Sequence, residues 1–235
     1  MGTFHWQELS ETGPAWEALL TELLAEAPGR KVMDAGCGTG FLALLLARCG
    51  WQVTAIDSSA EMIQQGRLAA SEMGLAERIV FQVSDAQAGA QTDCTFDAIV
   101  SRHASWLFPE PAAAYREWTR LLRPGGILLN MDANWLLPLW KTDISAQFWE
   151  DEAELICRYG EFQDCYHDKD LMQAFQQLPL AFQSRPAWDE HICRELGLLR
   201  VEGRLLKPEI YWNPFLAIRY RTVPTFVICA QKSIK

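Results

Sequence analysis

The chain has 235 residues, 49% hydrophobic and 22% charged, which is typical of a folded globular protein rather than a disordered one. The formal net charge of −9, with no cluster of Lys and Arg, argues against nucleic acid as a partner, because phosphate contacts need clustered cations. Seven cysteines without a dense framework, no secretory signal and no membrane-length apolar run predict reduced thiols in a cytoplasmic protein with no membrane partner.

Apolar runs and helical patterns alternate over the first 132 residues. A helical pattern over Trp16–Leu24 comes first. Five apolar runs predict strands at Lys31–Ala35, Gln52–Asp57, Arg78–Val83, Phe96–Ser101 and Gly126–Met131. The helices predicted between them are Phe41–Cys49, Ser58–Met73, which opens on a Ser58-x-x-Glu61 capping box, and Pro111–Leu122. Because the strands are apolar rather than alternating, we expect a parallel sheet with helices on both faces.

The pattern changes after Asp132. Two amphipathic helical patterns occupy residues 133–187, and a helix over Trp188–Leu196 and strands at Leu198–Leu206 and Thr225–Ala230 follow. The sequence therefore predicts an α/β fold, a doubly wound, mostly parallel seven-stranded Rossmann-like sheet. Residues 1–132 and 188–235 would form its core, and residues 133–187 a helical insertion after strand five, over the carboxyl edge of the sheet, where ligands bind.

Three glycines follow the first predicted strand, at Gly36, Gly38 and Gly40, and lead directly into a helix. Glycines at this spacing permit a tight turn and a close approach of a ligand to the backbone. The dinucleotide fingerprint G-x-G-x-x-G would place its third glycine at Phe41. Asp34 precedes the turn, and its carboxylate favours a cation bearing an ammonium and a sulfonium over a pyrophosphate.

The run from Asp34 to Gly40 resembles motif I of the class I S-adenosylmethionine-dependent methyltransferases of the small-molecule kind. Further landmarks follow in the order of that family: residues 96–101 resemble motif IV, and Leu-Arg-Pro-Gly-Gly at 122–126 resembles the turn before the fifth strand. The resemblance covers residues 30–132 and the last strand. It implies S-adenosylmethionine as the cofactor and methyl transfer to a small-molecule acceptor as the activity.

The resemblance also implies a set of cofactor contacts. Asp57 would bind the ribose hydroxyls, and Asp85 the adenine amino group. The full set expected to bind the cofactor is Asp34, Gly36, Cys37, Gly38, Thr39, Gly40, Asp57, Ser58, Met62, Asp85, Ala86 and Ser101.

The loop after the fourth strand faces the acceptor in this family. His103 lies there and is the candidate catalytic base, because imidazole titrates near neutral pH; alternatively it only positions the cofactor or the backbone. Arg102, Trp106, Trp135 and Trp6 are candidates for contact with the acceptor, although Arg102 could equally pair with an acid. The aromatic-rich insertion is expected to act as a lid over the acceptor.

Two other functions stay open at this point. Asp57 would also suit the ribose of NAD in a nicotinamide-dependent oxidoreductase, and a cofactor-binding protein without catalysis would carry the same turn. The spacings of Cys157, Cys165 and His167, and of His191 and Cys193, match no zinc pattern, so no metal is predicted. The acceptor, its reacting atom and the oligomeric state do not follow from these residues.

Overall fold

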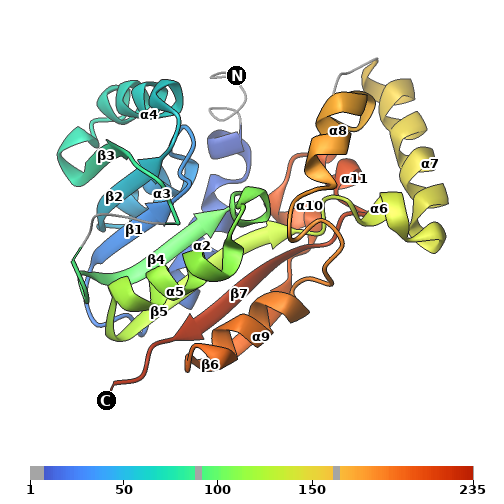
Figure 1. The fold of residues 1–235 in the computed structure, drawn as a ribbon. Helices are drawn as coiled ribbons and strands as arrows, with labels where there is room; N and C mark the ends of the chain where they lie inside the picture. The colour runs from blue at the N-terminus through green and yellow to red at the C-terminus, as the bar shows by residue number, and fades with distance from the viewer. Residues whose placement is uncertain (1–7, 88–91, 161–164, 235) are drawn as a thin grey trace.

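The computed structural model describes residues 8–87, 92–160 and 165–234 and contains a seven-stranded sheet in the order β3-β2-β1-β4-β5-β7-β6 (Figure 1). The strands are β1 Lys31–Ala35, β2 Gln52–Asp57, β3 Ile79–Val83, β4 Phe96–Arg102, β5 Leu122–Ala133, β6 Leu199–Leu205 and β7 Thr225–Gln231. Neighbours among β1 to β5 pair in parallel, while β7 runs antiparallel between β5 and β6. The predicted doubly wound, mostly parallel sheet is confirmed, and its order reverses between β1 and β4.

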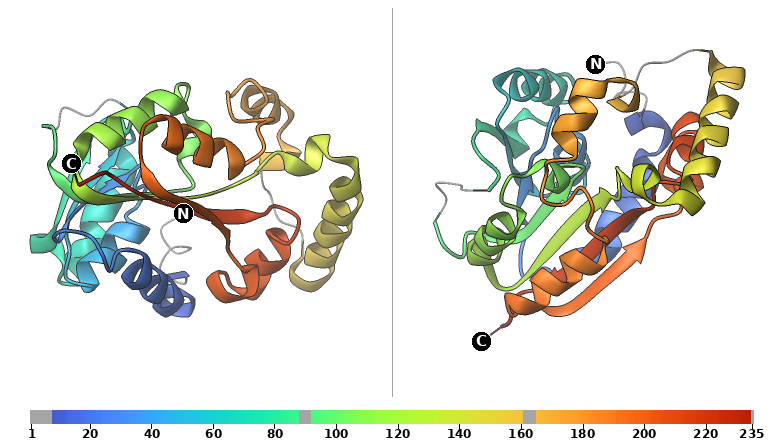
Figure 2. Two further views of the ribbon diagram at one scale, coloured as in Figure 1. Left: turned by 90° about the horizontal axis from the view of Figure 1, so that it is seen from below. Right: turned by 45° about the vertical axis from the view of Figure 1, so that its right-hand side comes forward.

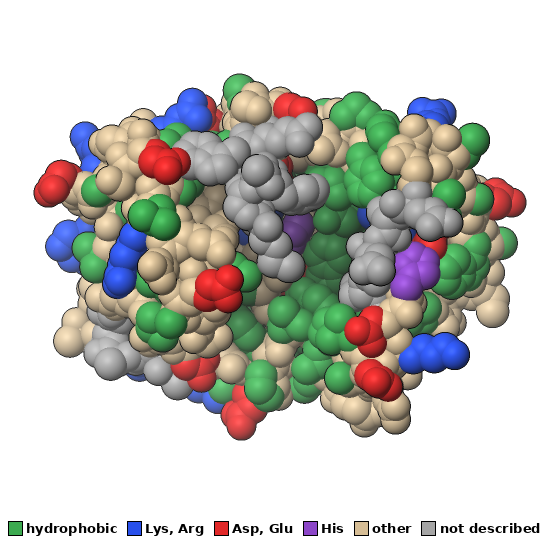
Figure 3. All heavy atoms as spheres, turned by 90° about the horizontal axis from the view of Figure 1, so that it is seen from above, with side chains coloured by type: hydrophobic (Ala, Val, Ile, Leu, Met, Phe, Trp, Pro, Cys, Tyr) green, Lys and Arg blue, Asp and Glu red, His purple; other side chains and the backbone are tan. Residues whose placement is uncertain are grey.

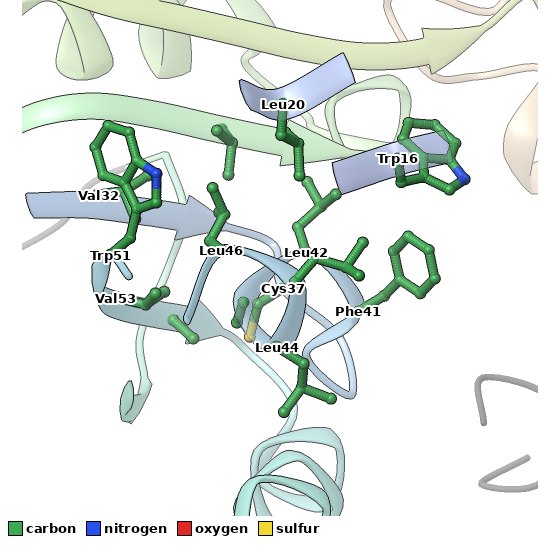
Figure 4. Packing of buried hydrophobic residues seen from close by; sticks show 14 of the residues in the cluster. Trp16, Leu20, Val32, Cys37, Phe41, Leu42, Leu44, Leu46, Trp51 and Val53 are labelled. Atoms are coloured by element: carbon green, nitrogen blue, oxygen red, sulfur yellow. The ribbon is translucent and has the colours of Figure 1, made fainter. Parts of the chain in front are cut away.

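Helices cover both faces of the sheet (Figure 2). On one face lie α2 Gly13–Leu23, α3 Phe41–Arg48 and α4 Ala60–Glu72, and on the other α5 Pro111–Leu121 and α9 Ala187–Glu195. A hydrophobic cluster fills each interface. The first contains Trp16, Leu20 and Trp51 (Figure 4), and the second contains Tyr115 and Trp118.

The central strands are mostly apolar because both their faces are buried. In β5, Ile127 and Leu129 belong to the first cluster and Leu128 to the second. In β7, Val227 and Phe226 divide between the clusters in the same way. Side chains alternate along a strand, so a strand covered on both sides needs a continuous apolar run, which is the pattern in the sequence.

Three predicted boundaries were wrong, and the first is the start of α2, which lies at Gly13 rather than Trp16. The expected turn at 122–126 lies within β5, because Leu122 already pairs with Phe96 and a register shift with Gly125 at φ 78° absorbs the Pro-Gly-Gly segment. The predicted capping residue of α4 was Ser58, but the hydroxyl oxygen of Ser59 accepts the cap hydrogen bond, at 3.2 Å from the backbone nitrogen of Met62.

Residues 133–187 carry α6 Leu137–Trp140, α7 Thr142–Tyr159 and α8 Lys169–Phe175, which lie beyond the carboxyl end of β5 (Figure 1). Two unpredicted helices, α10 Pro208–Tyr211 and α11 Pro214–Arg219, lie between β6 and β7. α11 packs on α7, where Arg219 stacks 4.8 Å from the ring centre of Phe148. The division into a core and an insertion at residues 133–187 stays a prediction. α11, from the C-terminal part of the chain, packs against α7 of the proposed insertion. Among the described residues, no helix has both the length and the apolar character needed to cross a membrane.

Candidate active site

The turn between β1 and α3 is shaped by its glycines and by Asp34. Gly36, Gly38 and Gly40 have φ angles of 72°, 54° and 90°, a region that favours glycine because other residues are strained there. Gly40 is the N-cap of α3 and has no side chain to cap it. The carboxylate of Asp34 accepts instead from the backbone nitrogen of Ala43, at 3.0 Å, so an acid on β1 satisfies the first turn of α3.

Asp57 connects the β1–α3 turn to the neighbouring turn between β2 and α4, at the carboxyl edge of the sheet. Its two carboxylate oxygens accept from the backbone nitrogens of Gly38, at 2.8 Å, and of Ser59, at 2.9 Å. The β1–α3 turn and the start of α4 are therefore braced against a single side chain at the end of β2. Lone pairs of both oxygens remain available for further donors.

These turns surround a cavity of about 710 Å³ at the carboxyl ends of the strands. Every residue expected to bind the cofactor lines it except Gly40 and Ser101. Gly40 lies behind the turn, where an added Cβ would meet the ring of Phe81 at 3.0 Å. The buried hydroxyl of Ser101 donates to the carbonyl oxygen of Ala35 at 2.8 Å and so ties β4 to β1.

Several lining residues were missed from the sequence. They are Phe41, Leu42, Ser59, Gln87, Ala104, Leu107, Phe108 and Pro109. Half of this set lies between Ala104 and Pro109, after β4, and only Arg102, His103 and Trp106 were singled out over residues 102–109. The apolar run 107–109 was the available signal, because an adenine ring needs apolar walls.

The cavity is suited to a cation with neighbouring hydroxyl groups. Asp34 and Asp57 supply carboxylates, and burial together with the charge of Asp57 raises the pKa of Asp34 to about 7. Burial also raises the pKa of Cys37, so its thiol is neutral. Thr39 lines the cavity, and its buried hydroxyl has no hydrogen-bond partner among the residues that the structure describes. An added Cβ at Gly38 would meet none of the described atoms within 4 Å. A polar ligand that approaches the backbone here would be within reach of that hydroxyl.

His103 lies between the cavity and a group of aromatic rings. It lines the cavity, has φ 56°, and its backbone nitrogen donates to the carbonyl oxygen of Met131 at 2.8 Å. Its ring centre lies 4.9 Å from that of Trp135, edge to face, 6.4 Å from that of Trp212 and 6.3 Å from that of Tyr220. A non-glycine residue at positive φ is uncommon and recurs at functional sites.

The rings beside His103 form what we call the aromatic cluster: Trp106, Trp135, Phe175, Trp212 and Tyr220. Ring centres are 5.9 Å apart for Trp106 and Trp135, and 4.8 Å apart for Trp106 and Phe175. Trp135 and Tyr220 lie 5.5 Å apart, and Trp212 and Tyr220 5.3 Å apart. Seen from above, hydrophobic side chains line a hollow between the side of α4 and the side of α7 and α8 (Figure 3). The sequence identified Trp106 and Trp135 but missed Trp212 and Tyr220.

The other predicted acceptor contacts have different surroundings. Arg102 lines the cavity, but its guanidinium pairs with Glu8 and packs between the rings of Trp16, at 4.7 Å, and Phe41, at 4.1 Å. Its charge is thus engaged within the chain, the alternative that the sequence left open. Trp6 lies outside the described residues. No cluster of three or more His, Cys, Asp or Glu side chains suited to a metal ion occurs in the part of the chain that the structure describes.

Comparison with known proteins identifies the class. Residues 33–130 match the family described as "Methyltransferase domain". A ubiquinone biosynthesis O-methyltransferase from Xanthomonas campestris pv. campestris is 31% identical over 206 residues, which cover 87% of this chain and 77% of that protein. One from Alkalilimnicola ehrlichii is 34% identical over 126 residues, which cover 54% of this chain and 51% of that protein.

Solved structures share the fold at low identity. Geranyl diphosphate C-methyltransferase from Streptomyces coelicolor A3(2), in complex with S-adenosyl-L-homocysteine, superposes with a TM-score of 0.66 at 17% identity, covering 97% of this chain and 82% of that one. The [4+2]-cyclase SpnF superposes with a TM-score of 0.64 at 20% identity, covering 94% and 82%.

With the fold and the site in place, these matches show that the chain belongs to the class I S-adenosylmethionine-dependent methyltransferases. It is an enzyme that uses S-adenosyl-L-methionine to methylate a small molecule. The NAD-dependent alternative is not favoured, since the family model and the relatives named above are methyltransferases and the glycine spacing differs from the dinucleotide fingerprint.

Proposed function

We propose that this enzyme transfers the methyl group to a hydroxyl oxygen of a small, apolar, ring-bearing acceptor, with His103 as the general base. The observation that carries the proposal is the place of His103, which lines the cofactor cavity on one side and contacts the aromatic cluster on the other. The O-methyltransferase names of the relatives support an oxygen acceptor.

The remaining cofactor contacts are part of this proposal. Asp57 would accept from the ribose hydroxyls while it holds the backbone of Gly38, and Asp85 would accept from the adenine amino group. Asp85 lies in a loop whose next residue, Ala86, is fixed because its carbonyl oxygen accepts from the indole nitrogen of the buried Trp118 at 2.9 Å. Asp34 would balance the positive charge of the cofactor.

The chemistry asked of the chain is alignment and removal of one proton. S-adenosylmethionine, when bound, supplies a methyl group on a sulfonium that is already a good leaving group. The imidazole of His103 would accept the proton of the acceptor hydroxyl as that oxygen takes the methyl group and the thioether sulfur leaves. The aromatic cluster holds the acceptor and excludes water from the reacting atoms.

The test compares acceptor atoms directly. The purified enzyme is given methyl-labelled S-adenosylmethionine with methyl 3,4-dihydroxybenzoate, and in parallel with the matching aromatic amine and thiol. We expect label on the catechol oxygen, and His103→Gln should lower kcat by about 10²–10⁴-fold. Label on the amine or thiol alone would contradict an oxygen acceptor. An undiminished rate in His103→Gln would contradict the base.

A lid role for residues 133–187 belongs to the same proposal. Trp135 does not line the cofactor cavity, but its ring contacts both His103 and Trp106. Trp135→Ala should therefore raise the KM of the acceptor or lower turnover, while the Kd of S-adenosylhomocysteine stays within about threefold. A Trp135→Ala variant with a lowered Tm and a weakened affinity for S-adenosylhomocysteine would show that Trp135 is a core residue instead.

A cytoplasmic location without a nucleic-acid or membrane partner completes the proposal. It is supported by six free cysteines among the described side chains, as expected in a reducing compartment, and by the acidic net charge of the chain.

A further inference from the structure

A buried polar group lies where the helical residues 133–187 leave the sheet and return to it. At its centre is Arg185, whose side chain is 1% exposed, beside Asp132 and Asp189, whose side chains are 0% exposed. Ser105, Tyr115 and Asn130 also belong to it and are wholly buried. The group joins the end of β5, the loop after β4, α5 and α9.

Arg185 uses its guanidinium donors on three of these partners. One terminal nitrogen donates to Asp132 Oδ2 at 2.8 Å. The other donates to Asp189 Oδ1 at 2.6 Å and to Ser105 Oγ at 2.8 Å, and Nε donates to Asp189 Oδ2 at 2.8 Å. Charged, forked hydrogen bonds of this kind fix orientation as well as distance.

The main chain of Arg185 is held at the same place. Its backbone nitrogen donates to the side-chain oxygen of Asn134 at 3.1 Å, and its carbonyl oxygen accepts from the side-chain nitrogen of Asn134 at 2.5 Å. Arg185 therefore attaches to the first residues after β5 by both its side chain and its backbone.

Asp132, which Arg185 holds, also accepts hydrogen bonds from two tryptophans beside the proposed methyl-acceptor site. Its Oδ1 accepts from the indole nitrogen of Trp135 at 2.7 Å, and its Oδ2 accepts from the backbone nitrogen of Trp106 at 3.0 Å. Trp135 is the ring that meets His103 edge to face at 4.9 Å. One carboxylate thus sets the place of both tryptophans.

We propose that Arg185 is a positioning residue of the acceptor site: through Asp132 it holds Trp106 and Trp135, and through Trp135 it sets the orientation of His103. This proposal rests on the proposed function, which places the methyl acceptor beside His103 and the aromatic cluster. A buried ion pair contributes little net stability compared with apolar residues of the same size, so its worth here is the geometry it imposes.

The test uses a signal that does not depend on turnover. In protein with 15N-labelled histidine, long-range proton–nitrogen spectra show the ring of His103, assigned by its loss in His103→Gln. Ring currents of Trp135 make these resonances sensitive to the relative placement of the two rings. We expect Arg185→Met to shift the His103 resonances while those of the exposed His191 stay in place.

Kinetics give the second readout. With methyl 3,4-dihydroxybenzoate as acceptor, Arg185→Met should lower kcat/KM by about ten- to a hundredfold, because small misplacements of reacting groups have effects of that size. The Kd of S-adenosylhomocysteine should stay within about threefold. Arg185→Lys should lie between wild type and Arg185→Met. The matched control is Arg194→Met. It removes a surface ion pair between Arg194 and Glu190 within α9 and should leave both readouts unchanged.

A folded Arg185→Met protein with His103 resonances and kcat/KM equal to those of Arg194→Met would overturn the proposal. If Arg185→Met does not fold, Asp132→Asn decides, since it keeps the shape of the side chain, and unshifted His103 resonances in that variant would overturn the proposal equally. Wild-type enzyme that methylates none of the acceptors would contradict the proposed function alone. The spectra still decide whether Arg185 positions His103.

Discussion

Asp34 and Asp57 each accept hydrogen bonds from backbone nitrogens of the turns around the cofactor cavity. These bonds orient the carboxylates before any ligand arrives. A site that is oriented in advance loses less side-chain freedom when it binds. Each acid therefore has a structural role beside the binding role proposed for it, and a variant must be designed to separate the two.

Replacing Asp57 tests this double role. Asp57→Ala should weaken S-adenosylhomocysteine binding by about 1.5–3 kcal/mol, because charged hydrogen bonds to the ribose and the brace on Gly38 are lost together. Asp57→Asn keeps one acceptor oxygen and should lose less. Calorimetry gives the affinities, and Asp93→Ala, an exposed acid outside the cavity, is the control. Equal affinity in all variants would mean that Asp57 does not contact the cofactor.

Asp34 should make cofactor binding depend on pH. Burial raises its pKa from 3.8 to about 7, so the carboxyl is protonated in the folded protein below neutrality. A cationic ligand favours the carboxylate, and the affinity for S-adenosylmethionine should rise between about pH 6 and pH 8, with release of a proton. Calorimetry in buffers of different ionisation enthalpy measures that proton.

The sign for stability follows from the same pKa. Because the folded value lies above the unfolded one, the free energy of unfolding falls as pH rises from about 4 to about 7. Asp34→Asn is the control for both effects. In binding, it also distinguishes protons released by Asp34 from protons released by the amino group of S-adenosylmethionine. Proton release that persists unchanged in Asp34→Asn would rule out Asp34 as its source.

Among the elements, the β1–α3 turn has glycines at positive φ, and it packs closely against the loop after β4 at Gly36 but not at Gly38. An added Cβ at Gly36 would approach Ala104 Cβ to 2.5 Å, whereas one at Gly38 would meet nothing within 4 Å. The first glycine is required by packing against the loop after β4. The second is required by its φ angle and by the space that it leaves to a ligand.

Alanine at the two positions should give different losses. Gly38→Ala should lower the free energy of unfolding by about 1–2 kcal/mol, the strain of a left-handed residue, and should weaken S-adenosylhomocysteine binding. Gly36→Ala should destabilise more, because Ala104 must also move. Denaturant unfolding and calorimetry on both variants measure this. The reverse order of stability would mean that the contact with Ala104 costs little.

At the scale of the whole molecule, two regions from distant parts of the sequence enclose one site. The carboxyl ends of β1, β2 and β4 and the loops after β1 to β4 supply most of the cofactor cavity. The aromatic cluster comes from the segments after β4 and β5, from α8 and from the segment 212–220. His103 lies between the two regions. Ligand binding should therefore stabilise the fold as a whole.

S-adenosylhomocysteine at about one hundred times its Kd should add about 2.7 kcal/mol to the free energy of unfolding and raise Tm by about 5–10 °C in a chain of this size. Differential scanning calorimetry measures the shift, with NAD at the same concentration as the comparison. NAD should give no shift. An equal shift with NAD would indicate a site selective only for adenosine.

Sequence patterns predicted the β1 to β5 strands closely, because each is a short apolar run between glycine, proline or polar residues. The start of β5 was wrong, since the pairing of Leu122 with Phe96 depends on a neighbouring strand. α10 and α11 were missed because helices of four and six residues have too few turns for a periodic pattern. Trp212 and Tyr220 were missed with them.

Sequence patterns were enough to predict the fold class, the glycine turn with Asp34 and the acid at the end of β2, because a few adjacent residues impose these local features on the backbone. Three contacts could be found only in the folded chain: Asp34 caps α3, Arg102 pairs with Glu8, and Arg185 holds Asp132. Such contacts join residues 9 to 94 positions apart, and only the packing of the elements brings them within hydrogen-bond distance.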